Sequence, residues 1–304
     1  MDFNQKLKAL RKQAGLSQEE LAEKISVSRQ AITKWETDNG LPDIENLIQI
    51  ARLFKVSLDD LLVYETVKET EKEYIYESVT EYDVDGTKHF DINTGGAHTV
   101  CVGTNEREKI RVRLASNTLA NIEKAFKVKI DEEKTKLDID VKHNNVYTEA
   151  QAKEFLHIFI ELPPQIAHGE LMAIAAGICI NGLSAEIFEV DGKFSKVKIN
   201  GFSGSLELNS ALDMDIRCEA FAGRLEVNQA FSTSVLNIPK GVRYNVLKKG
   251  RVSRISFTRD HIPFVHENTA DAENVIEVRG TRAELIINEY SAVDKNGGNE
   301  NEQL

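Results

Sequence analysis

Four polar residues near position 30 have the types and the spacing needed to read DNA. At about 100° of rotation per residue of an α-helix, they fall on one side while three apolar residues fall on the other. The polar residues are Arg29, Gln30, Thr33 and Lys34, and the apolar ones are Ala31, Ile32 and Trp35. Arginine can hydrogen-bond to guanine and glutamine to adenine in the major groove, and threonine or lysine can reach bases or phosphates. The spacing therefore predicts a helix that packs on one face and contacts DNA with the other.

A shorter helix is predicted immediately before this one. Ser17, followed three residues later by Glu20, forms a capping box that marks its start. Its apolar positions share one face and are Leu21, Ala22 and Ile25. Ser28 can cap the second helix by accepting a hydrogen bond from an amide of the first turn. The two segments together predict a helix-turn-helix.

Three further helices are predicted around this pair. One ends at Gly15, and its apolar residues at helical spacing are Phe3, Leu7, Leu10 and Ala14. Pro42 and Asp43 introduce a fourth helix, and Ser57 with Asp60 begins a short fifth. Five short helices predict a compact bundle over residues 1–63.

Residues 4–62 resemble the Xre/Cro-type helix-turn-helix family. The segments that carry the resemblance are Leu16–Ala22, Val27–Ile32, Trp35–Glu36 and Leu41–Pro42. The resemblance implies that Gln18 touches phosphate and helps to hold the reading helix. It also implies that Ser28 joins the residues at the groove and that Asn39 lies where backbone amides meet a phosphate. The expected DNA-contact residues are therefore Gln18, Ser28, Arg29, Gln30, Thr33, Lys34 and Asn39.

The charge of the chain favours two copies on one DNA site. The formal net charge is −11, but residues 1–62 hold nine Lys or Arg against ten Asp or Glu, so about −10 lies in the rest of the chain. A near-neutral reader binds non-specific DNA weakly, and an acidic remainder is repelled by the duplex. We therefore expect a homodimer or higher homo-oligomer on double-stranded DNA with a pseudo-palindromic operator.

Composition argues against a membrane, a cofactor or a metal. No secretory signal begins the chain, and its longest apolar run, 171–180, is too short for a bilayer, so we expect a cytoplasmic protein. The cysteines are far apart and are expected to be buried thiols: Cys101, Cys179 and Cys218. His89 with His98, or His261 with His266, could meet a metal, but lone surface histidines are far commoner, so no metal or cofactor is expected.

The sequence also lacks the signatures of an enzyme. A self-cleaving serine-lysine peptidase would suit a repressor-like chain, and 176–177 could mimic its cleavage site. Neither Met172 nor Met214 follows the serine that this nucleophile requires, and no serine is convincingly paired with a lysine. We expect no catalytic residues.

The remainder of the chain predicts an all-β domain. Residues 64–73 are polar and of mixed charge, as in a linker, whereas 74–290 contain segments in which apolar and polar residues alternate. The clearest alternating segments are 110–114, 126–130, 137–141 and 156–162. Residues 291–304 are rich in Asn, Gly and Glu and are expected to be a disordered tail.

A repeat of 19 residues lies within the β region. Residues 202–212 align without gaps on 221–231, and residues 280–288 echo 201–209, which suggests a last rung. One period earlier, Leu183, Ala185 and Ile187 are expected to fall on Phe202, Gly204 and Leu206. The glycines expected at corners are Gly201, Gly204 and Gly223. Such a period predicts stacked β units that bury one continuous core.

This region resembles the toastrack family of adhesin-like β-solenoid domains. The resemblance rests on residues 90–100, on 159–164 and on the Gly-x-Leu-Glu-[Leu/Val]-Asn segments at 204–209 and 223–228. It implies a β-solenoid or layered β-sheet, with no catalytic residues to transfer. The expected fold is therefore multidomain, an α-helical bundle followed by an all-β solenoid.

Together these patterns predict a sequence-specific DNA-binding transcriptional regulator, most simply a repressor. Its β domain would mediate oligomerisation or sense a signal or a protein partner. An alternative is an interaction scaffold, or a component of an antitoxin or defence locus, in which the helix-turn-helix only autoregulates its operon. A degenerate helix-turn-helix that serves protein contacts alone is also compatible with the sequence.

Overall fold

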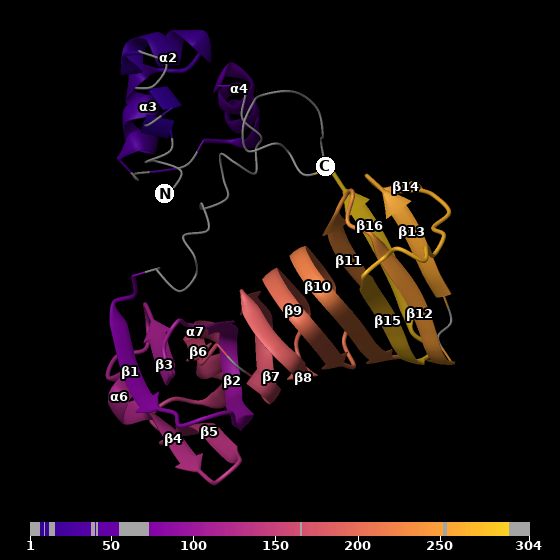
Figure 1. The fold of residues 1–304 in the computed structure, drawn as a ribbon. Helices are drawn as coiled ribbons and strands as arrows, with labels where there is room; N and C mark the ends of the chain where they lie inside the picture. Colours follow the sequence, from indigo (N-terminus) through magenta and orange to yellow (C-terminus); the bar gives the residue numbers. More distant parts are fainter. Residues whose placement is uncertain are drawn as a thin grey trace. The chain divides into compact units, whose positions relative to one another are not determined.

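The computed structural model describes residues 7, 8, 10, 11, 16–37, 40, 42–54, 73–164, 166–251 and 254–291. These residues fall into two compact units, one helical and one built of strands, with the division between Lys72 and Glu73 (Figure 1). The predicted fifth helix lies outside the described residues, as do the predicted linker and tail apart from Glu73 and Ser291. The predicted domain boundaries therefore stay predictions.

The helical unit contains the predicted helix-turn-helix. Its helices are α2 (Gln18–Lys24), α3 (Arg29–Glu36) and α4 (Ile44–Phe54), and Leu7, Lys8, Leu10 and Arg11 are also helical. The Asp43 carboxylate begins α4 by accepting a hydrogen bond from the Asn46 amide at 2.9 Å. One apolar cluster joins the helices and consists of Leu7, Leu21, Ala22, Ile25, Ile32, Trp35, Ile50 and Ala51.

The β unit is built on one continuous sheet. Its first elements are β1 (Tyr76–Asp83), β2 (His89–Thr104), β3 (Lys109–Ser116), α6 (Ile122–Ala125), β4 (Phe126–Glu132), β5 (Lys136–His143), α7 (Glu149–Phe155) and β6 (His157–Leu162). The later strands are β7 (Ile166–Asn181), β8 (Leu183–Lys193), β9 (Lys196–Ser210), β10 (Asp215–Ala230), β11 (Thr233–Pro239), β12 (Tyr244–Arg251), β13 (Arg254–Arg259), β14 (Ile262–Pro263), β15 (Asn274–Thr281) and β16 (Glu284–Tyr290). The four alternating segments named above match β3 to β6, apart from Leu156, which caps the end of α7, so those strand predictions are confirmed.

Long strands bend so that each contributes to two faces of a β-solenoid. Residues 89–93 of β2 pair with β5, whereas residues 99–104 pair with β6. In the same way, residues 215–217 of β10 pair with β11 and residues 224–230 pair with β15. We call the face that contains β6, β11 and β16 face A, and the face that contains β5, β8 and β15 face B. Side chains from both faces form one hydrophobic core, and β7 to β10 run side by side along it (Figure 1).

The 19-residue repeat sets the strand register. Phe202 pairs with Phe221, Gly204 with Gly223 and Asn209 with Asn228, as the alignment of the two segments predicts. Gly204 and Gly223 have φ values of 109° and 118°. A Cβ atom on Gly204 would lie 1.6 Å from the carbonyl oxygen of Ala185, so the corner admits no side chain there.

Two details of the predicted repeat are wrong. Leu183 and Ala185 pair with Phe202 and Gly204, but a bulge then shifts the register, so that Phe188 rather than Ile187 faces Leu206. The bulge keeps the larger Phe188 ring in the core and leaves Ile187 41% exposed. Residues 284–288 pair with β11 on face A, whereas the residues that they echo, 205–209, lie on face B, so this coil is half a turn out of step with the echo.

The coil formed by β15 and β16 is not the last rung in space. β15 lies between β10 and β12, and β16 lies between β11 and β13. The chain therefore makes β12 to β14 first and then returns to fill the gap in the stack. Gly280, near the end of β15, has a φ of 139°, and a Cβ atom there would lie 1.8 Å from the carbonyl oxygen of Gln229.

All three cysteines are buried as thiols, as expected. Burial raises the pKa of the Cys218 thiol to about 12, so this thiol is unreactive at neutral pH. Within the described residues, no helix has both the length and the apolar character needed to span a bilayer.

Candidate nucleic-acid interface

Helix α3 presents one buried and one exposed face. Its cap is Ser28, whose Oγ accepts a hydrogen bond from the Ala31 amide at 3.2 Å. Ile32 is fully buried and Trp35 is 8% exposed, so Trp35 belongs to the core, as predicted. The residues predicted to face the groove are all exposed: Ser28, Arg29, Gln30, Thr33 and Lys34. The helix can therefore offer a polar face without disturbing its packing.

Helix α2 begins with the predicted capping box. The Glu20 amide donates to Ser17 Oγ at 3.1 Å, and the Ser17 amide donates to Glu20 Oε2 at 2.7 Å. The hydrogen bond from the Ser17 amide lowers the pKa of the Glu20 carboxyl. Because both donors are satisfied locally, the helix has a fixed start and holds its buried residues, Leu21 and Ala22, against the core.

The turn between the two helices has one left-handed residue, Ser26, with a φ of 56°. The turn is closed by the Val27 amide, which donates to the Ala22 carbonyl at 3.0 Å. A residue other than glycine in this conformation costs roughly 1–2 kcal/mol. This conformation therefore lowers the stability of the turn.

Replacing Ser26 by glycine should stabilise the helical unit. Glycine removes the steric cost but loses about 0.5–1 kcal/mol through the entropy of the unfolded chain, so a net gain of about 0.5–1 kcal/mol is expected. Urea unfolding followed by fluorescence of Trp35, the only tryptophan, measures it. Ser26→Ala is the control, since alanine keeps the left-handed strain. A glycine variant no more stable than the alanine variant would contradict this account.

A buried ion pair holds the end of α3. Arg11 Nε and Nη2 donate to the two oxygens of Glu36 at 2.5 and 2.9 Å, and Arg11 Nη1 donates to the Leu16 carbonyl at 2.8 Å. The Glu36 side chain is 1% exposed and that of Arg11 is 11% exposed. This bidentate pair connects the first helical segment to the reading helix.

Gln18 extends the same network toward the exposed face. Its Nε2 donates to Glu36 Oε2 at 2.9 Å, and its Oε1 lies 3.3 Å from Thr33 Oγ1. The second Nε2 hydrogen of Gln18 has no bond in this network, so the same amide can also reach a phosphate. Gln18 thus links the start of α2 to the middle of α3, while its phosphate contact stays a prediction.

Opposing effects act on the Glu36 carboxyl. Burial acts to raise its pKa, but the hydrogen bonds from Arg11 and Gln18 outweigh burial and lower the pKa below its usual range. Glu36 therefore stays ionised and keeps the network intact at neutral pH.

The Arg29 and Thr33 side chains of α3 make only exposed contacts within the described part of the helical unit. Arg29 Nη1 lies 3.5 Å from Glu19 Oε2, and both side chains are 65% exposed. Such exposed pairs contribute little, so the guanidinium can exchange this carboxylate for a base edge. The Thr33 hydroxyl lies 3.0 Å from the Arg29 carbonyl.

The structure places five of the seven predicted contact residues on α2 and α3 and the sixth, Ser28, at the cap of α3, while Asn39 lies outside the described residues. Sequence reasoning missed the pairing of Arg11 with Glu36. Arg11 and Glu36 are 25 positions apart in the sequence. The signal that could have indicated their pairing is that each is a charged residue at a position where its helix packs against the core.

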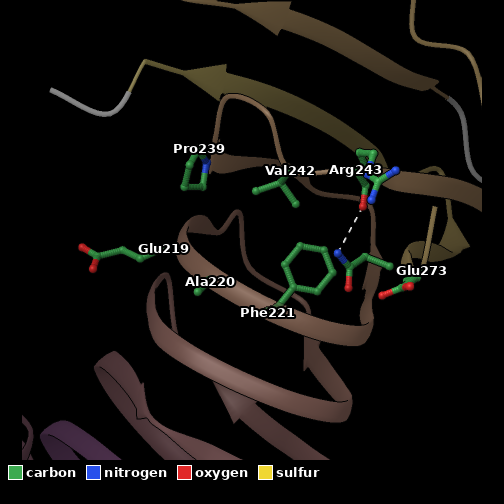
Figure 2. Close-up of a pocket in the computed structure, with 8 residues that line it drawn as sticks. Glu219, Ala220, Phe221, Pro239, Val242, Arg243 and Glu273 are labelled. Carbon is green, nitrogen blue, oxygen red and sulfur yellow. Dashed lines mark hydrogen bonds between the residues drawn. The ribbon is translucent and has the colours of Figure 1, made fainter. Parts of the chain in front are cut away.

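One of the hollows in the described part of the β unit has a volume of about 280 Å³ and lies near the start of β12 (Figure 2). It is lined by Glu219, Ala220, Phe221, Pro239, Val242, Arg243, Glu273 and Asn274. The Asn274 side chain donates to the Arg243 carbonyl at 3.1 Å and accepts from the Gly223 amide at 3.0 Å. These two hydrogen bonds of Asn274 connect the turn before β12 to the corner of β10.

Known proteins resemble the two units separately. The family profile described as Helix-turn-helix matches residues 7–61. The HTH-type transcriptional activator BcrR of Enterococcus faecalis is 44% identical over 85 residues, which are 27% of this chain and 42% of that protein. The cryptic phage CTXphi transcriptional repressor RstR of Vibrio cholerae is 34% identical over 61 residues, 20% of this chain and 54% of that protein. The chain thus spans about half the length of these relatives.

Solved structures resemble the β unit at low identity. A candidate cell adhesion protein from Clostridium sporogenes has 12% identity and a TM-score of 0.34, over 70% of this chain and 99% of that one. A candidate adhesin from Bacteroides fragilis has 11% identity and a TM-score of 0.28, over 70% and 97%. The solenoid architecture itself rests on the strand pairing described above.

One relative is matched over nearly its whole length. It is the HTH-type transcriptional regulator MJ0272 of Methanocaldococcus jannaschii, an uncharacterized protein that is 40% identical over 60 residues, 20% of this chain and 91% of that protein. Through its N-terminal domain, the chain belongs to the helix-turn-helix family of transcriptional regulators.

Proposed function

We propose that the protein is a cytoplasmic, sequence-specific transcriptional repressor that binds its operator as a homodimer. The observation that carries the proposal is the exposed polar face of α3 above a buried apolar face, held by the Arg11–Glu36 pair. Arg29 and Gln30 read bases, Thr33 and Lys34 contact bases or phosphates, and Gln18 and Asn39 contact phosphate. Repression is the simplest result of a protein that occupies promoter DNA.

Dimerisation supplies the affinity that one reader lacks. The reader is close to neutral, so a single copy has little electrostatic attraction for DNA. Two copies place their reading helices about 34 Å apart in successive major grooves, on a pseudo-palindrome. We propose that the β unit makes this dimer.

The edge strand β1 is suited to that contact. Among the described strands it pairs only with β3, and Val79 near its middle is 45% exposed. An unpaired edge with exposed apolar residues can add a strand from a second copy. Ile75, just before the strand, is 71% exposed and extends the apolar surface.

Val79→Lys should convert the dimer to a monomer, because a charge at the edge opposes strand pairing. Light scattering at micromolar concentration should give twice the chain mass of 34.1 kDa for the wild type and one chain mass for the variant. Val265→Lys is a matched control, since Val265 is 84% exposed but lies outside any strand. A monomeric wild type, with and without DNA, would refute the dimer.

Footprinting on the DNA upstream of the protein's own gene tests the function as a whole. We expect two protected half-sites about one helical turn apart and reduced transcription from that promoter. Increased transcription on the same sites would replace repression with activation. A chain that copurifies with a partner through its β unit and protects no site would favour the interaction scaffold.

A further inference from the structure

Two histidines from distant parts of the chain lie side by side on face B. His89 on β2 pairs in register with His168 on β7, and their ring centroids are 4.2 Å apart. Two residues further along the same strands, Asp91 pairs with Glu170. Because alternate residues of a strand point to the same side, the four side chains form a rectangle on one surface.

The ligand atoms of this rectangle converge on one carboxylate oxygen. Glu170 Oε1 lies 3.8 Å from His89 Nε2 and 3.7 Å from His168 Nε2. The three ligand atoms lie within 4.8 Å of one another, whereas ligand atoms about 2.1 Å from a tetrahedral metal ion are roughly 3.4 Å apart, so the side chains would move closer together on binding. The three side chains are 31–48% exposed, which leaves the site open to ions from solvent.

We propose that His89, His168 and Glu170 bind a divalent cation of borderline softness, with Zn²⁺ as the best fit. Two imidazoles and one carboxylate are a donor set that zinc accepts, whereas Mg²⁺ and Ca²⁺ prefer oxygen ligands alone. No spacing or motif indicated that His89 would pair with His168, and the proposal departs from the expectation that the chain binds no metal.

The neighbouring carboxylates can complete or orient the site. Asp91 Oδ1 lies 2.8 Å from His89 Nε2, and Glu189 Oε1 lies 3.1 Å from His168 Nε2. Either oxygen can become the fourth ligand after a small side-chain rotation. Lys136 pairs with Asp91 and Asp138, which fixes Asp91 beside His89.

The site lies in a continuous row of carboxylates on face B. In register across successive strands, the row contains Asp138, Asp91, Glu170, Glu189, Glu207, Glu226 and Glu277. At each end of the row, the carboxylates form ion pairs with basic side chains. These are Lys136 at one end and Arg224, Lys249 and Arg279 at the other. Within the described residues, the ion pairs of Glu170 and Glu189 are with the two histidines.

Excess negative charge in the middle of the row supports a cation there. Glu189 pairs in register with Glu207, and Asp191 lies two residues further along the same strand, so several carboxylates gather on this side of the site. A bound dication beside Glu189 would relieve this repulsion. Direct metal titration tests whether a cation binds there.

The test is a zinc titration of the full-length, tag-free protein against a chromophoric chelator. The wild type should bind one Zn²⁺ per chain, and His89→Ala or His168→Ala should weaken binding by about 100-fold or more, since second-shell losses alone reach roughly 10–100-fold. Glu170→Gln keeps the shape of the side chain and should also weaken binding. His261→Ala is the control, because it removes an exposed histidine elsewhere in the β unit.

A variant that misfolds would also lose zinc binding, so a second measurement uses only the wild-type protein. In the wild type, zinc should shift the ring ¹⁵N resonances of His89 and His168 and leave those of His261 and His266 unchanged. No zinc bound at micromolar concentration, or binding that survives in both histidine variants, would overturn the proposal. DNA is absent from both experiments, so the outcome is independent of the proposed repressor function.

Discussion

Arg29→Ala should weaken operator binding by about 1–3 kcal/mol, roughly 5- to 150-fold, and should relax discrimination at one base pair. The Arg29 guanidinium is held only by an exposed contact with Glu19, so little is lost in the free protein when it is removed. Gln30→Ala should have an effect of the same size at a different base pair. Binding to a set of operators with single base changes measures both effects.

Two control variants separate base reading from general attraction. Gln18→Ala should weaken all sequences more evenly, because its proposed contact is to phosphate. Arg52→Ala removes an equal charge from the exposed surface of α4 and should change operator binding little. Equal losses on operator and random DNA for Arg29, Gln30 and Gln18 variants would contradict the assignment of roles.

Glu36→Ala should destabilise the helical unit by about 3 kcal/mol or more, because it leaves the Arg11 guanidinium buried without a counter-ion. It also removes the acceptor of the Gln18 amide, so α3 loses two of its supports. Operator affinity should fall with stability. Urea unfolding followed by Trp35 fluorescence reports this unit alone, since the chain has one tryptophan and it lies in the helical core.

The double variant Arg11→Met with Glu36→Leu tests the mechanism. Replacing both ions by apolar residues removes the unpaired charge, so it should recover much of the stability that Glu36→Ala loses. A double variant as unstable as the single one would show that packing, rather than the buried charge, sets the cost.

Acid should have the same effect as removing Glu36. The pKa of Glu36 is lower in the folded state, so its contribution is complete above the unfolded carboxyl pKa of about 4.3. That contribution is lost as the pH falls through the folded pKa. The double variant lacks the Glu36 carboxyl. It should therefore lose less stability than the wild type as the pH falls from the unfolded carboxyl pKa through the folded one.

Local signals in the sequence predicted much of the helical unit. Ser17 with Glu20 and Ser28 mark helix starts through bonds to nearby amides, and the structure contains those bonds. The Arg11–Glu36 pair could not be predicted in this way. It depends on where two separate helices meet, and no periodicity within either one encodes that meeting.

The repeat predicted pairing within the solenoid because stacked coils share one register. The prediction failed where the chain departs from the period, at the bulge before Phe188 and at the inserted coil of β15 and β16. His89 and His168 show the same limit, since only the pairing of β2 with β7 brings them together. Side chains on neighbouring strands meet through topology, which the spacing of residues does not contain.

We propose that α3 reads a specific operator. Fluorescence anisotropy of the full chain on DNA from upstream of its own gene, with excess random competitor at about 50 mM and about 200 mM salt, tests it most directly. We predict binding that resists the competitor in the wild type and that is lost in Arg29→Ala. Binding that the competitor abolishes, or that Arg29→Ala leaves unchanged, would contradict the claim.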